Sequence, residues 1–443
     1  MHESTPELPG LSPVAGKAIV ARFDGGSLSS DAGVLALREV ERRLGIAGRL
    51  AACLDDPRRP ERIRHRLAEI IRFRLLMIAC GYEDGNDADD LRRDAAFKLA
   101  SERLPSDPDL CSQPTISRLE NQPDVRALLA MGRALVELYC QSFRQVPKRI
   151  VLDLDYTFDA VHGGQQLSLF HAHYDGYGFL PIVVFDGDGR LVTAILRPAK
   201  RPSGHEIRAH LRRLVRAIRA HWPRVEILIR GDSHYAGPEV FAWCRQNRVE
   251  FILGLATNPA LRAHVAGLEA ATRAGQAGPL KRRRYTEFWD AARSWPRVER
   301  IIARVEAGAD GVDTRFIVTS LTGRSAKRLY DDLYCRRGQA ENHIKAWKNH
   351  LAADRTSCSR ATANQFRLFL HAGAYWLMWS LRQLMPRRSA WRVAQFDTIR
   401  LRLLKLAARI VELKTKLFVH LATACPEQAV LRLVLERLPR LAI

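Results

Sequence analysis

Apolar and polar positions change their period near residue 148, and this change divides the chain into a helical part and a sheet part. Before it, apolar residues recur at spacings of three and four, which is typical of amphipathic helices. Helices are predicted at 31–44, 61–82, 86–100 and 123–143. Ser29 or Ser30 should cap the first helix and Gly45 should end it, and the apolar run at 17–23 predicts a strand. Residues 1–147 are therefore predicted to form an N-terminal, mainly helical domain.

After residue 148, short runs rich in β-branched residues predict strands. They lie at 149–155, 166–174, 179–185, 190–196, 225–232 and 249–255. The DGDG run at 186–189 is a hairpin signal, and Ser203 with Glu206 forms a capping box before a helix. Pro238 begins a second helix. Three antiparallel-type strands followed by helix, strand, helix and strand predict an α/β fold with a mixed sheet and helices on its faces.

Residues 258–325 interrupt this order. After a helical stretch, three basic and apolar runs separated by turns predict a small β-rich insertion with a very basic surface. Helical spacing returns at 326–360 and continues through 361–443, which is predicted to be a C-terminal helical region. The sheet-based core is thus expected to comprise 148–257 and 326–360.

The composition makes nucleic acid the leading predicted partner. The 443 residues include 70 Lys and Arg against 48 Asp and Glu, a formal net charge of +22. Such a field attracts polyanions and releases counterions when it meets phosphates. A ribosomal or structural basic protein would share this property, whereas a membrane surface fits less well because the sequence has no Lys-rich amphipathic anchor. The eight cysteines form no C-x-x-C pair, and without a signal peptide a cytoplasmic protein is expected.

One predicted helix carries its charges in an unusual arrangement. At about 100° per residue, five side chains fall on one narrow stripe: Tyr334, Arg337, Glu341, Lys345 and Lys348. An apolar stripe runs beside them, so the charges lie along the edge of the face that the helix buries. A solvated face with i,i+4 ion pairs would give a similar pattern.

Acidic residues end two of the predicted strands. Asp153 and Asp155 lie on one face of the strand at 149–155, and Asp232 ends the strand at 225–232. A crossover helix joins these strands, so we expect them to be parallel neighbours with their carboxyl ends together, where open α/β sheets bind ligands. Each aspartate alone would also suit a turn or a helix cap. As a group they repel one another unless a divalent cation lies between them.

The strand-end aspartates and Glu341, in a strongly basic chain, match the requirements of two-metal phosphoryl transfer on nucleic acid. On this interpretation Arg337 and Lys348 hold phosphates beside the metals. Tyr334 would bond to a phosphate or stack on a base.

Three motifs carry a family resemblance. The spacing Y-x2-R-x3-E-x6-K occurs at Tyr334, Arg337, Glu341 and Lys348. A D-x-T run begins at Asp155, and Gly231 directly precedes Asp232. The chain resembles bacterial insertion-sequence transposases of the DDE class, whose RNase H-like core has a β-rich insertion before the glutamate helix.

The resemblance implies that Asp155, Asp232 and Glu341 are catalytic and bind two Mg2+ ions, which Mn2+ can replace. It implies nicking at a transposon end, hairpin formation by the freed 3′-OH and strand transfer into target DNA. The implied partners are terminal inverted repeats, target DNA and a second copy of the chain in a homodimer on paired ends. In such enzymes a flipped base meets an aromatic residue of the insertion, for which Trp295 and Trp289 are the candidates.

Further DNA contacts are predicted from local sequence. The candidates are Ser117, Arg118, Lys345, Arg282, Arg283 and His234. The first two are small polar and arginine side chains at a helix start, which suit phosphates or base edges and equally suit a plain surface helix. His171 and His173 share a strand face, but without a third ligand a surface role is favoured over a metal site.

Two other functions fit parts of this pattern. A catalytically inactive, transposase-derived regulator would bind DNA, yet it would have no reason to keep the acids, because negative side chains at a phosphate site weaken binding. A different RNase H-like nuclease, such as a resolvase, would not need Tyr334 and Lys348 at these spacings.

Overall fold

A computed structural model of the protein describes residues 6–276 and 280–441. The chain divides into two compact units, each with its own core. The first contains residues up to Ala51, Asp56–Leu119 and Leu377–Leu441, and the second contains Ala52–Asp55 and Glu120–Trp376. Segments from the two ends of the sequence thus share the first unit, and the division does not follow the expected boundary at residue 147.

The first unit is mainly helical, with one small sheet. Its helices are α1 (Val34–Leu44), α2 (Ile46–Ala51), α3 (Leu67–Cys80), α4 (Ala88–Leu91), α5 (Ala95–Ala100), α14 (Phe396–Ile399) and α15 (Gln428–Arg437). The buried helix α3 packs against α1, α2 and α5. The sheet has the order β1 (Leu28–Ser29), β13 (Ala408–Glu412) and β14 (Leu417–Leu421), all antiparallel. Two further helices, α6 (Gln113–Glu120) and α13 (Ala361–Gln383), span the residues at which the units divide.

Several predictions for the first unit were wrong in detail. The run at 17–23 forms no strand and is mostly exposed, and the long helix expected from residue 61 begins only at Leu67. Gly33, without a side-chain cap, precedes α1, although Gly45 ends this helix in the left-handed conformation as expected. The hairpin β13–β14 replaces part of the predicted C-terminal helix, because β1 supplies a pairing partner from a distant part of the sequence.

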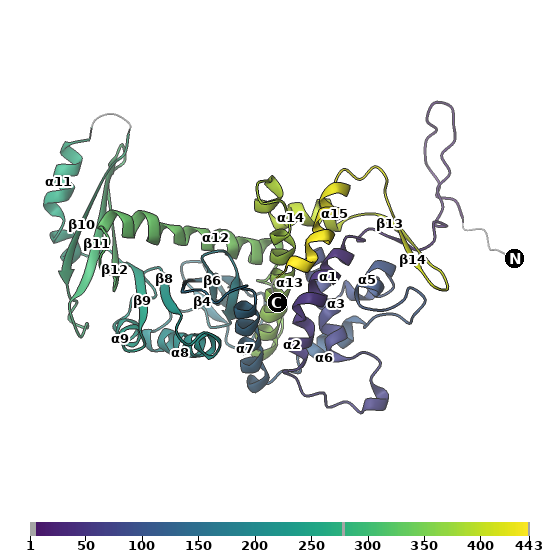
Figure 1. Cartoon of the computed structure of the whole chain (residues 1–443), viewed down its shortest axis with the longest axis horizontal. Coiled ribbons are helices and arrows are strands. Elements are labelled where there is room, and N and C mark those ends of the chain that lie inside the picture. Colours follow the sequence, from purple (N-terminus) through teal and green to yellow (C-terminus); the bar gives the residue numbers. More distant parts are fainter. Residues whose placement is uncertain (1–5, 277–279, 442–443) are drawn as a thin grey trace. The chain divides into compact units, whose positions relative to one another are not determined.

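The second unit is built on an eight-stranded mixed sheet (Figure 1). Its order is β10 (Arg282–Asp290), β11 (Glu299–Gly308), β12 (Gly311–Thr319), β9 (Val249–Leu255), β8 (Glu226–Gly231), β2 (Arg149–Tyr156), β6 (Ile182–Asp186) and β7 (Leu191–Ile195). Strands β2, β8 and β9 are parallel, and the other neighbours are antiparallel. The predicted mixed sheet, its 186–189 hairpin and its crossover are confirmed.

Helices cover both faces of this sheet. They are α7 (Val125–Gln141), α8 (Gly204–His221), α9 (Pro238–Gln246), α10 (Pro259–Ala263), α11 (Ala266–Ala274) and α12 (Gly338–Lys345). The Ser203 side chain accepts a hydrogen bond from the Glu206 amide at the start of α8, so this predicted cap is confirmed. In Figure 1, α8 and α9 lie on one side of the sheet and α12 on the other.

The β-rich insertion is part of the core sheet and not a separate meander. Strand β12 pairs with β9 through four residue pairs, and β11 and β10 continue the sheet outwards. Ile302 and Ile317 face a core that includes Leu329 and Tyr330, whereas neighbouring residues of the same strands face α10 and α11. This alternation lets one sheet carry helices on both faces, so the insertion and the core fold as one layer.

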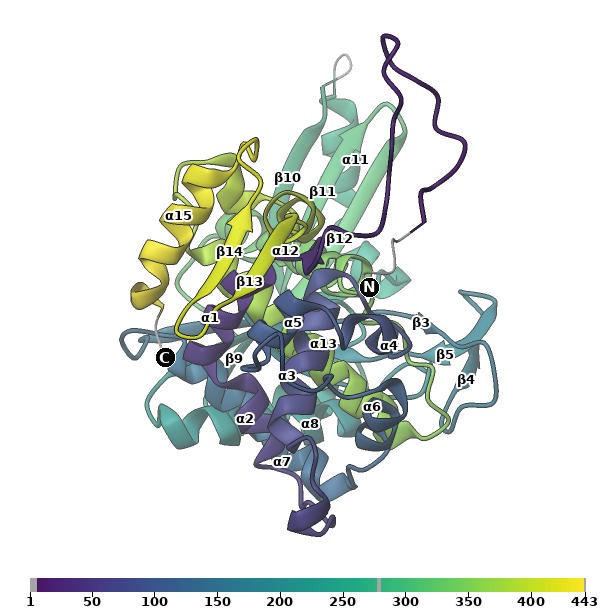
Figure 2. The ribbon, with the colours of Figure 1, turned by 90° about the vertical axis from the view of Figure 1, so that its right-hand side faces the viewer.

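A second, smaller sheet of the same unit holds residues expected to form one longer strand at 166–174. It has the order β3 (Asp159–Ala160), β5 (Gly176–Phe179) and β4 (Leu169–His171), and it stands out beside the main sheet in Figure 2. Across the described ranges, no helix combines the length and apolar composition needed to cross a membrane.

Candidate active site

Asp155 and Asp232 lie side by side at the ends of two neighbouring parallel strands. Leu154 of β2 is in register with Gly231 of β8, so the next residue on each strand is an aspartate. The sequence predicted this juxtaposition from the crossover helix α8, and the structure confirms it. The two acids mark the edge of the sheet at which open α/β folds bind ligands.

The electrostatics of Asp155 reflect this arrangement. The pKa of its carboxyl is raised to about 6, mainly by burial and also by the negative charge of Asp232, against the lowering influence of Arg337 and the Tyr156 amide. A carboxylate with a raised pKa gains most from a cation beside it. The site is therefore short of positive charge even with Arg337 present.

Arg337 connects the two acidic elements. Its Nη1 donates a hydrogen bond to Asp155 Oδ2 at 2.7 Å, and its Nη2 lies 4.0 Å from Glu341 Oε1. The guanidinium thus lies between the strand-end acid and the helix-borne acid. The Glu341 side chain is 69% exposed.

The segment with the predicted signature is helical but irregular. It begins with a π-type segment (Arg328–Tyr334) and a 3₁₀ turn (Cys335–Arg337), continues as α12 and ends in another π-type segment (Ala346–His350). The spacing of an ideal α-helix does not hold through such turns. The five predicted side chains therefore do not share one stripe: Tyr334, Arg337 and Lys348 are partly buried, whereas Glu341 and Lys345 are exposed.

An ion pair beneath the site was missed by the sequence interpretation. Arg230 donates to both carboxyl oxygens of Asp153, at 2.6 and 2.7 Å, and both residues are buried. Arg230 also donates to the Leu333 carbonyl at 2.7 Å. It therefore ties the signature helix to the sheet. The sequence did hold a signal for this pair. Asp153 precedes Asp155 by two residues and Arg230 precedes Asp232 by two residues, so each lies on the same face of the sheet as the aspartate that follows it.

Tyr334 reaches the sheet through a close approach to Gly254. A Cβ at Gly254 would lie 2.8 Å from the Tyr334 hydroxyl and 3.1 Å from the Ser233 amide nitrogen. Burial raises the pKa of Tyr334, and the charge of Asp232 adds to the effect against the opposing charge of Arg337, so this hydroxyl stays protonated. Glycine at position 254 is what makes room for it.

The loop after β8 holds Asp232 in place. The His234 amide donates to Asp232 Oδ1 at 2.9 Å, and His234 Nδ1 lies 3.1 Å from Oδ2. The His234 ring packs edge-to-face on Tyr156, with ring centroids 5.0 Å apart. His234 is thus an orienting partner of Asp232 in this structure, and its predicted contact with DNA stays a prediction.

Lys348 is held at the other end of the signature helix. Its Nζ donates to the Phe158 carbonyl and lies 3.8 Å from Asp354 Oδ2. Asp159 is fully buried nearby, and neither of its carboxyl oxygens has a hydrogen-bond partner among the described residues. Burial raises the pKa of Asp159 well above its ordinary value, and Lys348 opposes this shift.

The side chains at this edge are of the kind that binds a divalent cation, but they are not grouped closely enough to surround one. Carboxylate oxygens are the ligands that Mg2+ prefers, and Asp155 with Asp232 supplies them at adjacent strand ends. Within 6–276 and 280–441, however, no three His, Cys, Asp or Glu side chains are grouped closely enough to hold a metal ion. Glu341 lies beyond Arg337 and does not join the aspartate pair in this structure.

The other predicted DNA contacts are divided between the two units. Ser117 and Arg118 belong to the first unit, where Arg118 is exposed and donates to the Thr115 hydroxyl at 3.0 Å. In the second unit, Trp295 packs edge-to-face on Phe241 at 5.3 Å and contributes to a core, whereas Trp289 is 59% exposed. The exposed candidate of the two tryptophans is therefore Trp289.

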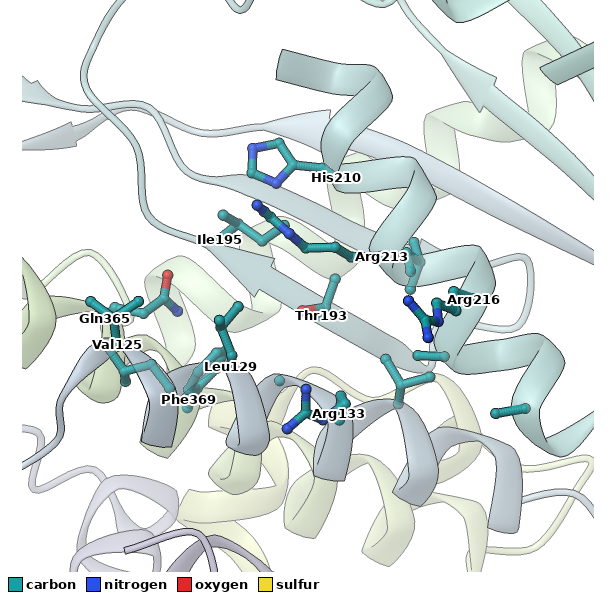
Figure 3. Close-up of a pocket in the computed structure, with 16 residues that line it drawn as sticks. Val125, Leu129, Arg133, Thr193, Ile195, His210, Arg213, Arg216, Gln365 and Phe369 are labelled. Carbon is teal, nitrogen blue, oxygen red and sulfur yellow. The ribbon is translucent and has the colours of Figure 1, made fainter. Parts of the chain in front are cut away.

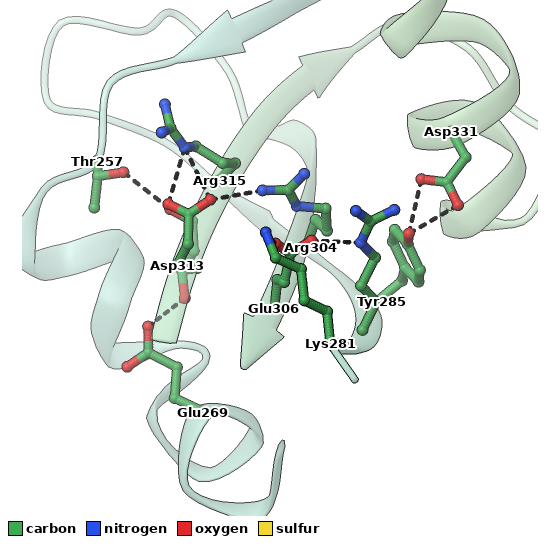
Figure 4. Close-up of polar contacts among 11 residues, drawn as sticks. Thr257, Glu269, Lys281, Tyr285, Arg304, Glu306, Asp313, Arg315 and Asp331 are labelled. Carbon is green, nitrogen blue, oxygen red and sulfur yellow. Dashed lines mark hydrogen bonds and ion pairs between the residues drawn. The ribbon is translucent and has the colours of Figure 1, made fainter. Parts of the chain in front are cut away.

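Acidic side chains of the insertion neutralise part of its own positive charge. Figure 4 shows Glu306 beside Lys281, and Asp313 between Arg304 and Arg315. Arg283 also pairs with Glu306, and Arg282 donates to the Gly275 carbonyl. These ion pairs reduce the field that the insertion presents to phosphates.

A groove of about 600 Å3 lies elsewhere in the second unit, between α7, α8, β7 and α13 (Figure 3). Apolar side chains line it, and Arg133, Arg213 and Arg216 border it. None of the acidic or DNA-contact residues predicted from the sequence lines this groove. The candidate active site is therefore the open sheet edge and not the groove.

The sheet order, with aspartates at the ends of two central parallel strands and a later glutamate helix against the sheet, is that of an RNase H-like core. The family model described as Transposase DDE domain group 1 matches residues 11–443, so the chain belongs to this family of DDE transposases.

Among solved structures, the chain is similar to a piggyBac transposase, determined by cryo-EM as a synaptic complex with hairpin DNA. The identity is 9% and the TM-score 0.38, over 91% of this chain and 89% of that chain. No curated protein matches the sequence.

Proposed function

We propose that this transposase excises an insertion sequence and joins it to target DNA, with Asp155, Asp232 and Glu341 as its catalytic acids. The observation that carries the proposal is the pairing of Asp155 and Asp232 at adjacent parallel strand ends, with the Glu341 helix linked to Asp155 through Arg337. A regulator that only binds DNA would gain nothing from these negative charges, because they weaken binding to phosphates.

Mg2+ is the proposed cofactor, as two ions that Mn2+ can replace, with Asp155, Asp232 and Glu341 as the protein ligands. Such ions supply Lewis-acid activation of an attacking oxygen and stabilisation of the leaving oxygen. The chain's own contribution is a set of hard oxygen ligands and a raised Asp155 pKa, which favours a bound cation.

The signature helix is proposed to position the DNA. Arg337 presents a planar fork suited to a phosphate, and Lys345 is exposed one turn after Glu341. Lys348 and Tyr334 contact DNA in this proposal next to the same sheet edge. Ser117, Arg118, Arg282, Arg283 and Trp289 are proposed as further contacts, and His234 as a contact beside Asp232.

The finer steps of the reaction are proposed from the family resemblance. They are nicking at the terminal inverted repeats, a hairpin intermediate on one side of the cut, and strand transfer by a homodimer on paired ends. The support in this chain is the complete set of signature residues.

The test is cleavage of a labelled duplex that carries the DNA flanking the gene, analysed on denaturing gels with Mg2+, with Mn2+ and with EDTA. We expect cleavage with either metal and none with EDTA. Asp155→Asn, Asp232→Asn and Glu341→Gln should each abolish it while duplex binding persists. Asp310→Asn, at an exposed turn of the insertion, is the matched control and should cleave normally. Full cleavage by any of the three active-site variants would contradict the assignment.

A further inference from the structure

The first unit begins with an arm, defined as residues 6–23, that projects away from the helices (Figure 2). All of its residues except Ala21 are exposed. The arm folds back on itself: the Leu8 amide donates to the Ala21 carbonyl at 2.9 Å, and Val14 and Lys17 exchange two hydrogen bonds of 3.0 Å. The two residues between this pair have positive φ, as a type I′ hairpin turn requires. The arm is therefore a two-stranded ribbon.

This ribbon leaves its large apolar side chains uncovered. They are Leu8, Leu11, Val14, Ile19, Val20 and Phe23. A hairpin of two strands is marginally stable in water and needs a third strand or a covering element. Apolar side chains gathered on a projecting element mark a surface that binds another molecule.

The charge of the arm favours a protein over DNA as that molecule. Between residues 6 and 24, Lys17 and Arg22 are balanced by Glu7 and Asp24, so this stretch has no net charge in a chain of net charge +22. Arg22 is also paired with Glu7 within the ribbon. An arm that enters a DNA groove needs free positive charge for the phosphates.

The first strand of the ribbon, residues 8–14, cannot accept a neighbour on its outer side. Leu8 and Val14 bond to the second strand, so alternation along the strand points the backbone of Pro9 and Pro13 outwards. Proline has no N–H to offer there, which is why it is found at sheet edges. This side of the ribbon therefore resists further strand pairing.

The second strand has a free side that can pair. The sequence predicts a strand for residues 17–23, and the run contains neither proline nor glycine. Lys17 and Ala21 bond to the first strand, so alternation points the Val20 amide to the free side. What this strand lacks is a second partner.

The same unit has an open sheet edge at β14. This strand ends the order β1–β13–β14, and its described partner is β13 alone. Leu417, Phe418 and Leu421 are exposed on it. Because the Leu413 amide bonds to the Lys416 carbonyl at the hairpin turn, alternation points the amides at 417, 419 and 421 to the open side. An exposed apolar edge of this kind is a template for another strand.

The arm cannot reach this edge in its own chain. Residues 24–27 link it to β1, which lies at the opposite edge of the sheet. A position beside β14 is three strand spacings from β1, about 14 Å. The link from Phe23 to Leu28 spans at most about 18 Å when fully extended. That length is too short to pass over the side chains of two intervening strands, so the arm requires the edge of another molecule.

We propose that two copies of this chain exchange their arms, and that residues 17–23 of each copy add a strand to the β14 edge of the other. The proline-bearing strand then ends the combined sheet and prevents further addition. The exchange is symmetric, so each dimer contains the contact twice. This inference names the surface of the homodimer in the proposed function, but it does not depend on the catalytic assignment.

The experiment is sedimentation equilibrium of the full chain in EDTA and without DNA, where we expect a dimer. Val20→Pro removes an outward donor of the arm, and Val419→Pro removes an outward donor of β14. Each should raise the dimer dissociation constant by about tenfold or more, because each removes two hydrogen bonds per dimer. Phe23→Ser changes a side chain that is 81% exposed, so it cannot disturb the fold, and it should also weaken the dimer.

A mixture of two variants isolates the exchange. Val20→Pro keeps an intact β14 edge and Val419→Pro keeps an intact arm, so a heterodimer retains one complete contact whereas either homodimer retains none. Fluorescein-labelled Val20→Pro should therefore bind Val419→Pro more tightly than it binds itself. Val146→Pro makes the same substitution in an exposed loop of the second unit and is the matched control, with unchanged dimerisation.

A chain that is monomeric at all concentrations would overturn the exchange, and so would variants that dimerise like the unaltered chain. Equal binding in the mixture and in the homodimers would also overturn it. Loss of duplex affinity in Phe23→Ser with unchanged dimerisation would show that the arm binds DNA instead. Failure of the proposed function is separable, because Asp155→Asn should dimerise normally whether or not it cleaves DNA.

Discussion

Arg337 donates a hydrogen bond to Asp155 at 2.7 Å, although 182 positions separate the two residues in sequence. The guanidinium occupies the side of Asp155 that faces the Glu341 helix. The phosphate-binding role proposed for Arg337 and the metal-binding role proposed for Asp155 therefore concern the two partners of one ion pair. We infer that DNA phosphate and the Asp155 carboxylate compete for the same arginine.

Replacing Arg337 by Gln should remove this competition together with the charge. Because Arg337 lowers the pKa of Asp155, its loss should raise that pKa above about 6 and move the acid limb of the pH–rate profile upwards. We expect cleavage to fall by about 10²-fold, since the phosphate also loses its positioning group. Arg336→Gln, at the exposed neighbouring position, is the control and should keep both the rate and the profile. An unshifted acid limb in Arg337→Gln would show that Asp155 does not govern it.

The ionised carboxylate of Asp155 should lower the free energy of unfolding at neutral pH. Its carboxyl has a pKa of about 6 in the folded state against an ordinary 3.8, so the folded state holds the proton more tightly. Stability therefore falls as the pH rises from about 4 to 6. Asparagine at position 155 cannot ionise. We therefore expect Asp155→Asn to raise the free energy of unfolding by about 3 kcal/mol at pH 7.5 and by less than about 1 kcal/mol at pH 4. Urea unfolding at both values checks this; an equal difference at pH 4 and pH 7.5 would contradict it.

The sequence was sufficient for the parts of the site that depend on local pattern and chain order. The runs around Asp155 and Asp232 are short, apolar and joined by a capped helix, so their parallel pairing followed from handedness and strand order. The placement of Glu341 did not follow, because the π-type turns that flank α12 change the spacing on which the stripe depended.

Non-local pairing explains the remaining differences. The run at 408–421 has helical spacing among its leucines, yet it forms a hairpin because Leu28–Ser29 offers a strand edge from the far end of the chain. Likewise, β12 joins β9 because the insertion leaves and returns at one sheet edge. Such partners cannot be found in a window of adjacent residues. The salt bridge between Asp153 and Arg230 follows only once β2 and β8 are paired in parallel.

Gly254→Ala should impair the site without unfolding the protein. The added methyl group would meet the Tyr334 hydroxyl and the backbone at Ser233, so Tyr334 has to move away from position 254. We expect at least about a tenfold loss of cleavage, since small displacements of positioning groups are costly. Gly267→Ala, in α11 with open space around it, is the matched control and should leave cleavage unchanged. A thermal scan alongside distinguishes a local shift from loss of the fold.

The buried pair of Asp153 and Arg230 gives a prediction about stability that is independent of DNA. Removing one partner leaves the other charge buried and unpaired, so Asp153→Asn or Arg230→Met should each lower the free energy of unfolding by about 3–5 kcal/mol. The double variant Asp153→Leu with Arg230→Met removes both charges and should recover a large part of that loss. Its recovery should remain incomplete, because the Leu333 carbonyl loses the donor that ties the signature helix to the sheet. Urea unfolding of the two single variants and the double variant measures the coupling, and additive losses would show that the pair does not act as a unit.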